Sequence, residues 1–313
     1  MDFPSCFTTQ RILLMEGALG TRLRGEYHLA FDENVAMAAM IYTEQGRAAL
    51  HALWTGYAQV ARRFGLPFLA ATPTRRANRE RVCARHPAAI LEDNVRFLQA
   101  VQRENAIPMY VGGLMGCRGD AYTGAGALEA AEARRFHGWQ ADRLAPAGAD
   151  FLYAGIMPTL PEAVGMAQAM ADTGLPYIIS FTLLKTGMLP DETPLHAAIE
   201  RIDASVGHGP VCYMTNCVHP DIVGEALSQP FNKTALVRGR FRGIQANASP
   251  LPPEELDNAA ELRRTSPQSL AQSLKALGRA MDLKIVGGCC GTDERFLAAM
   301  AEEMTGGKAP FPG

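Results

Sequence analysis

Eight short apolar stretches, each followed by a longer amphipathic stretch, recur along the chain. This alternation is typical of parallel strands connected by crossover helices. Eight consecutive β-then-α units favour a closed barrel over an open doubly wound sheet, which usually has about five or six strands. The predicted fold is therefore α/β, a single (β/α)₈ TIM barrel. We expect it to span residues 1–305, with residues 306–313 as a frayed tail.

The expected elements follow from hydrophobic periodicity. Strands are expected at Ile12–Met15, Phe68–Ala71, Met109–Gly112, Phe151–Ala154, Tyr177–Phe181, Val211–Met214, Gly243–Ala246 and Lys284–Gly287. Helices are expected at Ala48–Phe64, Ala88–Glu104, Leu128–Ala145, Leu160–Thr173, Pro194–Ala204, Asp221–Leu227, Leu270–Met281 and Asp293–Met304. The Pro-rich segment Ser249–Pro253 directly follows a predicted strand, which indicates a loop within one domain.

The composition narrows the class of partner and the compartment. The chain has 313 residues, of which 48% are hydrophobic, and this is enough for one large core. A net charge of −2, with no Lys/Arg run longer than two residues, argues against nucleic acid and membrane surfaces as partners. The first residues lack the pattern of a secretory leader and no long apolar stretch occurs, so we expect a cytoplasmic protein. A homo-oligomer is left open.

Two adjacent cysteines give the densest chemical signal. Cys289 and Cys290 lie in the segment VGGCCGT at the expected end of the eighth strand. Neighbouring side chains on a strand point to opposite faces, so both thiols reach one point only if the backbone departs from regular β geometry. Gly287, Gly288 and Gly291 permit that departure.

A third cysteine lies at the expected end of the sixth strand. Cys217 belongs to the segment TNCVHP, and the C-terminal ends of all barrel strands open onto one face. Cys217 is therefore expected to meet Cys289 and Cys290 there. Three thiolates with a vacant fourth position form the ligand set of a catalytic Zn²⁺ site. His219 is an alternative ligand or a neighbour of the site. The remaining thiols are expected to be small core residues, namely Cys6, Cys83, Cys117 and Cys212.

The spacing alone leaves other uses of these thiols open. Seven irregularly spaced cysteines indicate reduced thiols rather than a disulfide framework. A vicinal pair such as Cys289–Cys290 is also typical of a redox switch that forms a reversible disulfide. A further interpretation is a structural zinc site, in which removal of the metal ion unfolds the protein. A non-catalytic zinc-binding or redox-sensing barrel is thus the alternative to an enzyme.

Six segments together carry a family resemblance. They are EGALGT at 16–21, ATPTRRANRERV at 71–82, GGLMGCRG at 112–119, NC at 216–217, QANAS at 245–249 followed by EELD at 254–257, and GGCCGT at 287–292. In these segments the chain resembles the homocysteine S-methyltransferase family. That family includes betaine–homocysteine and S-methylmethionine–homocysteine methyltransferases and the homocysteine-binding module of methionine synthase. The likeness covers nearly the whole chain.

The resemblance implies a specific chemistry. Zn²⁺ held by Cys217, Cys289 and Cys290 would bind the thiol of homocysteine as a thiolate. Metal coordination removes the proton of a thiol whose pKa is otherwise about 8.5. The thiolate then takes a methyl group from a cationic sulfonium or betaine-type donor, giving methionine. The implied partners are a small-molecule thiol and a methyl donor. A different thiol acceptor, or a separate corrinoid protein as donor, is the alternative.

The resemblance also assigns residues around the acceptor. Glu16 and Asn216 are expected to act in catalysis and to bind substrate, and Asn247 is expected to bind substrate. From the residues alone, the alternative role of Glu16 is to cap the following turn, and Asn216 equally satisfies the loop backbone. The family has a glutamate where Gly155 stands, and Ile156 offers no hydroxyl to the open metal position. These departures preserve thiol chemistry but weaken recognition of an α-ammonium group.

Overall fold

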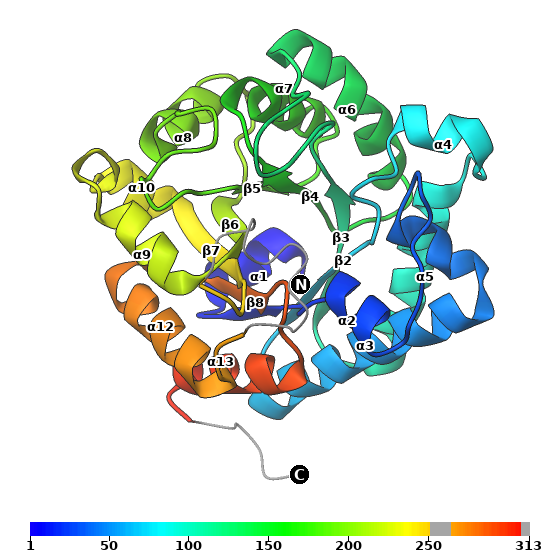
Figure 1. The fold of residues 1–313 in the computed structure, drawn as a ribbon, viewed down its shortest axis with the longest axis horizontal. Helices are drawn as coiled ribbons and strands as arrows, with labels where there is room; N and C mark the ends of the chain where they lie inside the picture. Colours follow the sequence, from blue (N-terminus) through cyan, green and yellow to red (C-terminus); the bar gives the residue numbers. More distant parts are fainter. Residues whose placement is uncertain (251–263, 308–313) are drawn as a thin grey trace.

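The computed structural model describes residues 1–250 and 264–307, and its strands form one closed parallel barrel. The eight strands pair in chain order, and β8 pairs with β1 (Figure 1). This confirms the predicted (β/α)₈ barrel. The strands are β1 Leu13–Met15, β2 Phe68–Ala71, β3 Met109–Met115, β4 Phe151–Met157, β5 Tyr177–Phe181, β6 Cys212–Val218, β7 Phe241–Ala246 and β8 Ile285–Gly288.

Helices surround the barrel (Figure 1). Those that the sequence pattern predicted are α3 Glu44–Phe64, α5 Ile90–Asn105, α6 Ala130–Leu144, α7 Leu160–Ala171, α8 Leu195–Asp203, α9 Pro220–Ser228, α12 Pro267–Ala280 and α13 Glu294–Thr305. The pattern did not predict the shorter elements α1 Phe3–Thr9, α2 Gly20–Gly25, η1 Met37–Tyr42, α4 Arg79–Arg85, η2 Pro230–Asn232 and α10 Ala235–Arg240. No helix in the described ranges combines the length and apolar character needed to cross a bilayer.

Helix α3 shows how local sequence sets these bounds. It begins four residues before the expected Ala48, because the Thr43 side chain accepts a hydrogen bond from the Gly46 N–H and so caps the first turn. It ends at Phe64. The next residue, Gly65, has a left-handed φ of 62°, and its N–H donates to carbonyl groups of the last turn. Its inner face buries Trp54, which therefore reaches the barrel wall.

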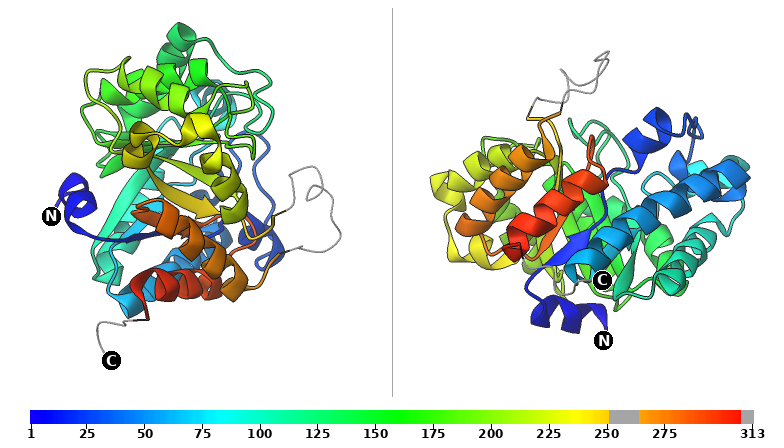
Figure 2. Two further views of the ribbon diagram at one scale, coloured as in Figure 1. Left: turned by 90° about the vertical axis from the view of Figure 1, so that its left-hand side faces the viewer. Right: turned by 90° about the horizontal axis from the view of Figure 1, so that it is seen from below.

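The N-terminal end of the barrel is closed by α1. Phe3 stacks on Phe151 of β4 with 4.5 Å between ring centroids, and both side chains are buried. Burial of an aromatic side chain of this size stabilises the fold by roughly 2–3 kcal/mol. Figure 2 places α1 at the end of the barrel opposite the α2 segment. The C-terminal ends of the strands therefore form the open face.

Four strands extend beyond their expected ends on that face, and the extension of β8 is Gly288, which pairs with Ala246. β3, β4 and β6 continue to Met115, Met157 and Val218 because these residues still pair with neighbouring strands, as Val218 does with Ala246. Glycines and polar residues in the extensions concealed them from a hydrophobicity pattern. The extension of β6 carries Cys217 within the barrel mouth.

The cysteines outside the predicted cluster have different environments. Cys6 and Cys212 are buried in the core, as expected. The expectation for Cys83 is wrong, because this residue is exposed. It belongs to the short helix α4, in which the adjacent Val82 is buried. Cys117 is only partly buried, in the loop that follows β3. The predicted tail beyond residue 307, and the segment EELD, lie outside the described residues.

Candidate metal centre and active site

Three thiols from two distant segments meet at the open face of the barrel. Cys217 lies near the end of β6, and Cys289 and Cys290 directly follow the end of β8. Their Sγ atoms all lie within 4.8 Å of one another, and those of Cys217 and Cys290 are 3.4 Å apart. All three residues are half-buried. This cluster is able to hold a metal ion.

The backbone turns at two points to bring these sulfurs together. Cys217 itself has a left-handed φ of 63°, and the pairing of β6 with β7 shifts register beside it. An L-residue rarely adopts this conformation, so the surrounding structure holds it there. On the other side, Gly291 has a φ of 78°, as expected for the turn that carries the cysteine pair.

The other two glycines of the motif have a different role from the one expected. Gly287 and Gly288 do not adopt left-handed φ values. A Cβ on Gly287 would lie 2.8 Å from the Cβ of Met15, and one on Gly288 would overlap Thr292. These glycines therefore allow β8 to approach β1 and the following turn closely.

The three thiols cannot all ionise without a cation. Hydrogen bonds from the Cys289 and Cys290 thiols hold the pKa of Cys217 well below its usual value. The same contacts raise the pKa of Cys289 well above its usual value and that of Cys290 to about 12. The metal-free cluster therefore concentrates its negative charge on the Cys217 sulfur, and a divalent cation would favour ionisation of all three.

Two further side chains donate to the Cys217 sulfur. The Tyr122 hydroxyl lies 3.5 Å from Cys217 Sγ, and Asn247 Nδ2 lies 3.6 Å from it. Sequence reasoning missed Tyr122. The sequence does contain a turn-forming residue there, Asp120, whose carboxylate accepts hydrogen bonds from the Tyr122 and Thr123 N–H groups. That signal predicts a turn after β3 but not that the loop reaches across the mouth to β6.

A cavity of about 550 Å³ opens beside Cys217, between the loops after β5, β6 and β7. Asn216, Asn247 and His219 line it. The Asn216 carbonyl oxygen accepts a hydrogen bond from Ser180 at 2.8 Å, so its amide group is fixed. His219 does not join the sulfur cluster, and its Nδ1 accepts a long hydrogen bond from the Asp221 N–H at the start of α9. Asn247 thus contacts the Cys217 sulfur, whereas the Asn216 and His219 side chains line the cavity beside it.

Glu16 occupies a different environment from these residues. Its Oε2 accepts hydrogen bonds from the Trp54 indole at 2.6 Å and from the Ala71 N–H at 3.2 Å. The side chain is almost fully buried, and this burial raises its pKa to about 8. The carboxyl group is therefore largely protonated at neutral pH, and it joins β1, β2 and α3 at the barrel mouth.

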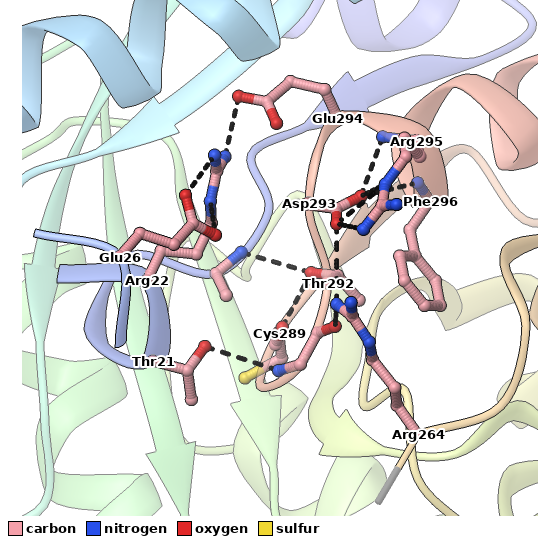
Figure 3. Close-up of polar contacts among 12 residues, drawn as sticks. Thr21, Arg22, Glu26, Arg264, Cys289, Thr292, Asp293, Glu294, Arg295 and Phe296 are labelled. Carbon is pink, nitrogen blue, oxygen red and sulfur yellow. Dashed lines mark hydrogen bonds and ion pairs between the residues drawn. The ribbon is translucent and has the colours of Figure 1, made fainter. Parts of the chain in front are cut away.

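Thr292 fixes the turn that carries the cysteine pair. Its hydroxyl accepts a hydrogen bond from the Ala18 N–H at 3.2 Å and donates one to the Cys289 carbonyl at 2.7 Å (Figure 3). The Gly291 N–H also donates to the Thr21 hydroxyl at 3.4 Å, so the turn is attached to the start of α2. On its other side, the Cys289 N–H donates to β7. The sulfur positions therefore depend on hydrogen bonds to the segment between β1 and α2 on one side and to β7 on the other.

We expect Thr292→Val to weaken metal binding about 10- to 100-fold, since supporting contacts to ligands have effects of that size. Valine keeps the shape but leaves the Ala18 N–H without its buried acceptor and frees the Cys289 carbonyl. Competition with a coloured chelator measures the affinity. Thr292→Ser retains the hydroxyl and serves as the matched control. Equal metal affinity in the Val and Ser variants would contradict this role.

The fold and the site define a barrel protein with a cluster of three thiols, able to hold a metal ion, at the C-terminal face of its strands. Residues 13–304 match the sequence profile of the homocysteine S-methyltransferase family, and the chain belongs to that family. It is therefore a methyltransferase, and membership supports homocysteine as the methyl acceptor. This agrees with the resemblance found in the sequence motifs.

Solved structures of the homocysteine methyltransferase MmuM from Escherichia coli are similar to this chain. The metallated form has a TM-score of 0.73 and 21% identity, and the match covers 95% of this chain and 98% of that chain. The oxidised form has a TM-score of 0.72 and 21% identity, covering 94% and 96%. At this level of identity the likeness shows the shared fold. Comparison with curated proteins found no significant match.

Proposed function

We propose that this protein is a zinc-dependent S-methyltransferase. It moves a methyl group from a cationic sulfonium or betaine-type donor to a thiol, homocysteine, and so forms methionine in the cytoplasm. The observation that carries the proposal is the cluster of Cys217, Cys289 and Cys290 beside an open cavity. A catalytic zinc site needs three protein ligands and a free fourth position, and this arrangement offers both.

The sulfur spacing fits Zn²⁺. Zn–S bonds of about 2.3 Å in a tetrahedral arrangement separate the sulfurs by about 3.8 Å. The Cys217 and Cys290 sulfurs are 3.4 Å apart, close to this value, and all three sulfurs lie within 4.8 Å of one another. Sulfur ligands also favour zinc over magnesium or calcium, which prefer oxygen. The metallated form of the relative MmuM shows that a protein of this fold binds a metal.

Zinc held by the three cysteines would keep the thiol of the bound substrate ionised at neutral pH. In the overall reaction this sulfur forms a bond to the methyl carbon, the donor's C–S⁺ or C–N⁺ bond breaks, and the thiol proton passes to solvent. Asn216 and Asn247 orient substrate at the cavity beside Cys217. Glu16 contributes its buried carboxyl group at the neighbouring edge of the mouth. The main task of these residues is alignment of methyl and sulfur.

A chelation experiment tests the proposal. Removal of zinc is expected to abolish methyl transfer while the protein remains folded and its melting midpoint falls by only a few degrees, because the barrel core is separate from the metal site. Added Zn²⁺ should restore activity. Unfolding on chelation would instead indicate a structural zinc. Retained activity in the metal-free protein would contradict the proposal.

The donor is identified by a substrate panel. Purified zinc-loaded protein is incubated with homocysteine and either a sulfonium or a betaine donor, and methionine is measured. Turnover with a small donor alone would exclude the need for a separate corrinoid protein. Absence of turnover with every small donor, together with activity on adding a methylated corrinoid protein, would favour that alternative.

A further inference from the structure

The loop between β3 and α6 carries Tyr122 to the sulfur cluster. Residues 116–129 form this loop, and they contain no helix or strand. Much of the loop is exposed, and so is Tyr122. Its hydroxyl nevertheless lies 3.5 Å from Cys217 Sγ, and its side chain lines the cavity. Contacts at other points of the loop therefore have to fix its path.

A single buried carboxylate holds the two ends of this loop. Glu162 lies in the first turn of α7, and its side chain is fully buried. Its Oε1 accepts a hydrogen bond from the Arg118 N–H at 2.7 Å, and its Oε2 accepts a longer one from the Leu128 N–H at 3.4 Å. Arg118 lies near the start of the loop and Leu128 near its end. The carboxylate therefore closes the segment 118–128 into a compact loop.

His137 is a third partner of the same carboxylate. Its Nε2 lies 2.9 Å from Glu162 Oε1, and both side chains are fully buried. Burying a carboxylate is unfavourable unless hydrogen bonds compensate for its lost hydration. Helices α6 and α7 pack side by side, so His137 on α6 reaches Glu162 on α7 (Figure 1). The two packed helices therefore set the position of the carboxylate, and the loop follows it.

The middle of the loop is held against the barrel mouth. The buried Thr182 hydroxyl, directly after β5, donates to the Ala121 carbonyl at 2.6 Å. Within the loop, the Asp120 N–H donates to the Ala125 carbonyl at 2.9 Å. A Cβ on Gly119 would overlap that carbonyl, so the chain passes close to itself at this glycine. The loop is therefore held at its middle as well as at its ends.

We propose that Glu162 is a positioning residue for the three-thiol site. By holding both ends of the segment 118–128, it places the Tyr122 hydroxyl at the Cys217 sulfur and the tyrosine ring in the cavity wall. A hydrogen bond to a ligating sulfur stabilises its negative charge, so it affects metal affinity. The role of Glu162 in methyl transfer rests on the proposed function, whereas its effect on the loop and the thiols does not.

Titration of the metal-free protein with Co²⁺ tests this positioning. Cobalt bound by thiolates absorbs through sulfur-to-metal charge transfer, and loss of a hydrogen bond to the sulfur moves that band to longer wavelength. Tyr122→Phe removes only the hydroxyl and should move the band in this direction and weaken cobalt binding about 10-fold. Glu162→Gln keeps the size of the side chain but replaces one oxygen by an amide NH₂, which cannot accept from the loop. It should reproduce both changes.

The double variant distinguishes positioning from a general structural role. If Glu162 acts through Tyr122, Glu162→Gln should add less than about threefold to the loss of cobalt affinity in Tyr122→Phe. Losses that multiply would overturn the inference, because Glu162 would then affect the thiols by another route.

Asp172→Asn is the matched control. Asp172 also joins α7 to α6, through Arg134 at 2.8 Å, but it lies at the opposite end of α7 from Glu162. The control should leave the cobalt affinity and the band unchanged. Equal changes in Asp172→Asn and Glu162→Gln would overturn the inference, since any loosening of the two helices would then be sufficient.

Two further variants keep the inference testable if Glu162→Gln does not fold. Glu162→Asp keeps the charge, but its shorter side chain cannot reach both ends of the loop. Gly119→Ala leaves the carboxylate unchanged, and its added Cβ has to displace the loop from the Ala125 carbonyl. Each should move the cobalt band to longer wavelength. An unchanged band in both folded variants would overturn the inference.

These measurements separate the inference from the proposed function, because none of them needs a methyl donor or turnover. If the wild type transfers methyl groups but Glu162→Gln leaves cobalt binding unchanged, only the role of Glu162 is rejected. If the variants change cobalt binding as expected and the wild type transfers no methyl group, the proposed function fails and the positioning role stands. Absence of cobalt binding in the wild type would reject both.

Discussion

Replacing Cys217 or Cys290 by serine is expected to reduce the bound metal from one per chain to below about one tenth, and to lower turnover by on the order of 10³-fold or more. A hydroxyl group stays protonated where a thiol ionises, so the site loses one of its three sulfur ligands. Supporting contacts outside a metal site already change affinity 10- to 100-fold, and a direct ligand has the larger effect. Elemental analysis and a methyl-transfer assay measure the two quantities.

The same substitution at Cys83 is the matched control, because this exposed thiol lies on α4, away from the cluster. Cys83→Ser should retain full metal content and activity. Melting curves of all variants show whether the fold is intact. Metal content near one per chain in both Cys217→Ser and Cys290→Ser would remove the basis of the zinc assignment.

The barrel was predictable because its strands are apolar and its helices amphipathic. β2 and β5 have the expected bounds, since both consist of continuous apolar or small residues between clear turn signals. The elements that were missed are short. Helix α4 depends on the Asn78 side chain, which caps its first turn, and α1 depends on Asp2 in the same way. A single capping residue is too weak a signal to predict a helix of seven residues.

The convergence of the three cysteines was predictable for a topological reason. Parallel strands of a closed barrel end on one face, so Cys217 and the Cys289–Cys290 pair had to approach each other. Tyr122 was not predictable in this way, because it lies in a loop rather than at a strand end. A loop's path depends on tertiary contacts, such as that of Tyr122 with Cys217, and the sequence pattern does not encode these contacts.

The raised pKa of Glu16 predicts that the free energy of unfolding depends strongly on pH. Its pKa is about 8 in the folded protein and 4.5 in the reference state, because burial opposes ionisation. The folded state therefore holds this proton more tightly than the unfolded state. The resulting stability is fully present below pH 4.5 and is lost as the pH rises through 8. Over that interval the loss amounts to roughly 3–5 kcal/mol, at about 1.4 kcal/mol per pKa unit.

Glu16→Gln mimics the protonated carboxyl and can keep an oxygen acceptor for Trp54 and Ala71. We expect the metal-free variant to match the wild type in unfolding free energy near pH 5 and to become more stable by several kcal/mol above pH 8. Thermal melts at pH 5, 6.5 and 8.5 measure the divergence, with exposed Glu132→Gln on α6 as the control. Parallel pH curves for wild type and Glu16→Gln would mean that the buried carboxyl ionises normally. Glu16 would then be a charged group available to an ammonium substrate.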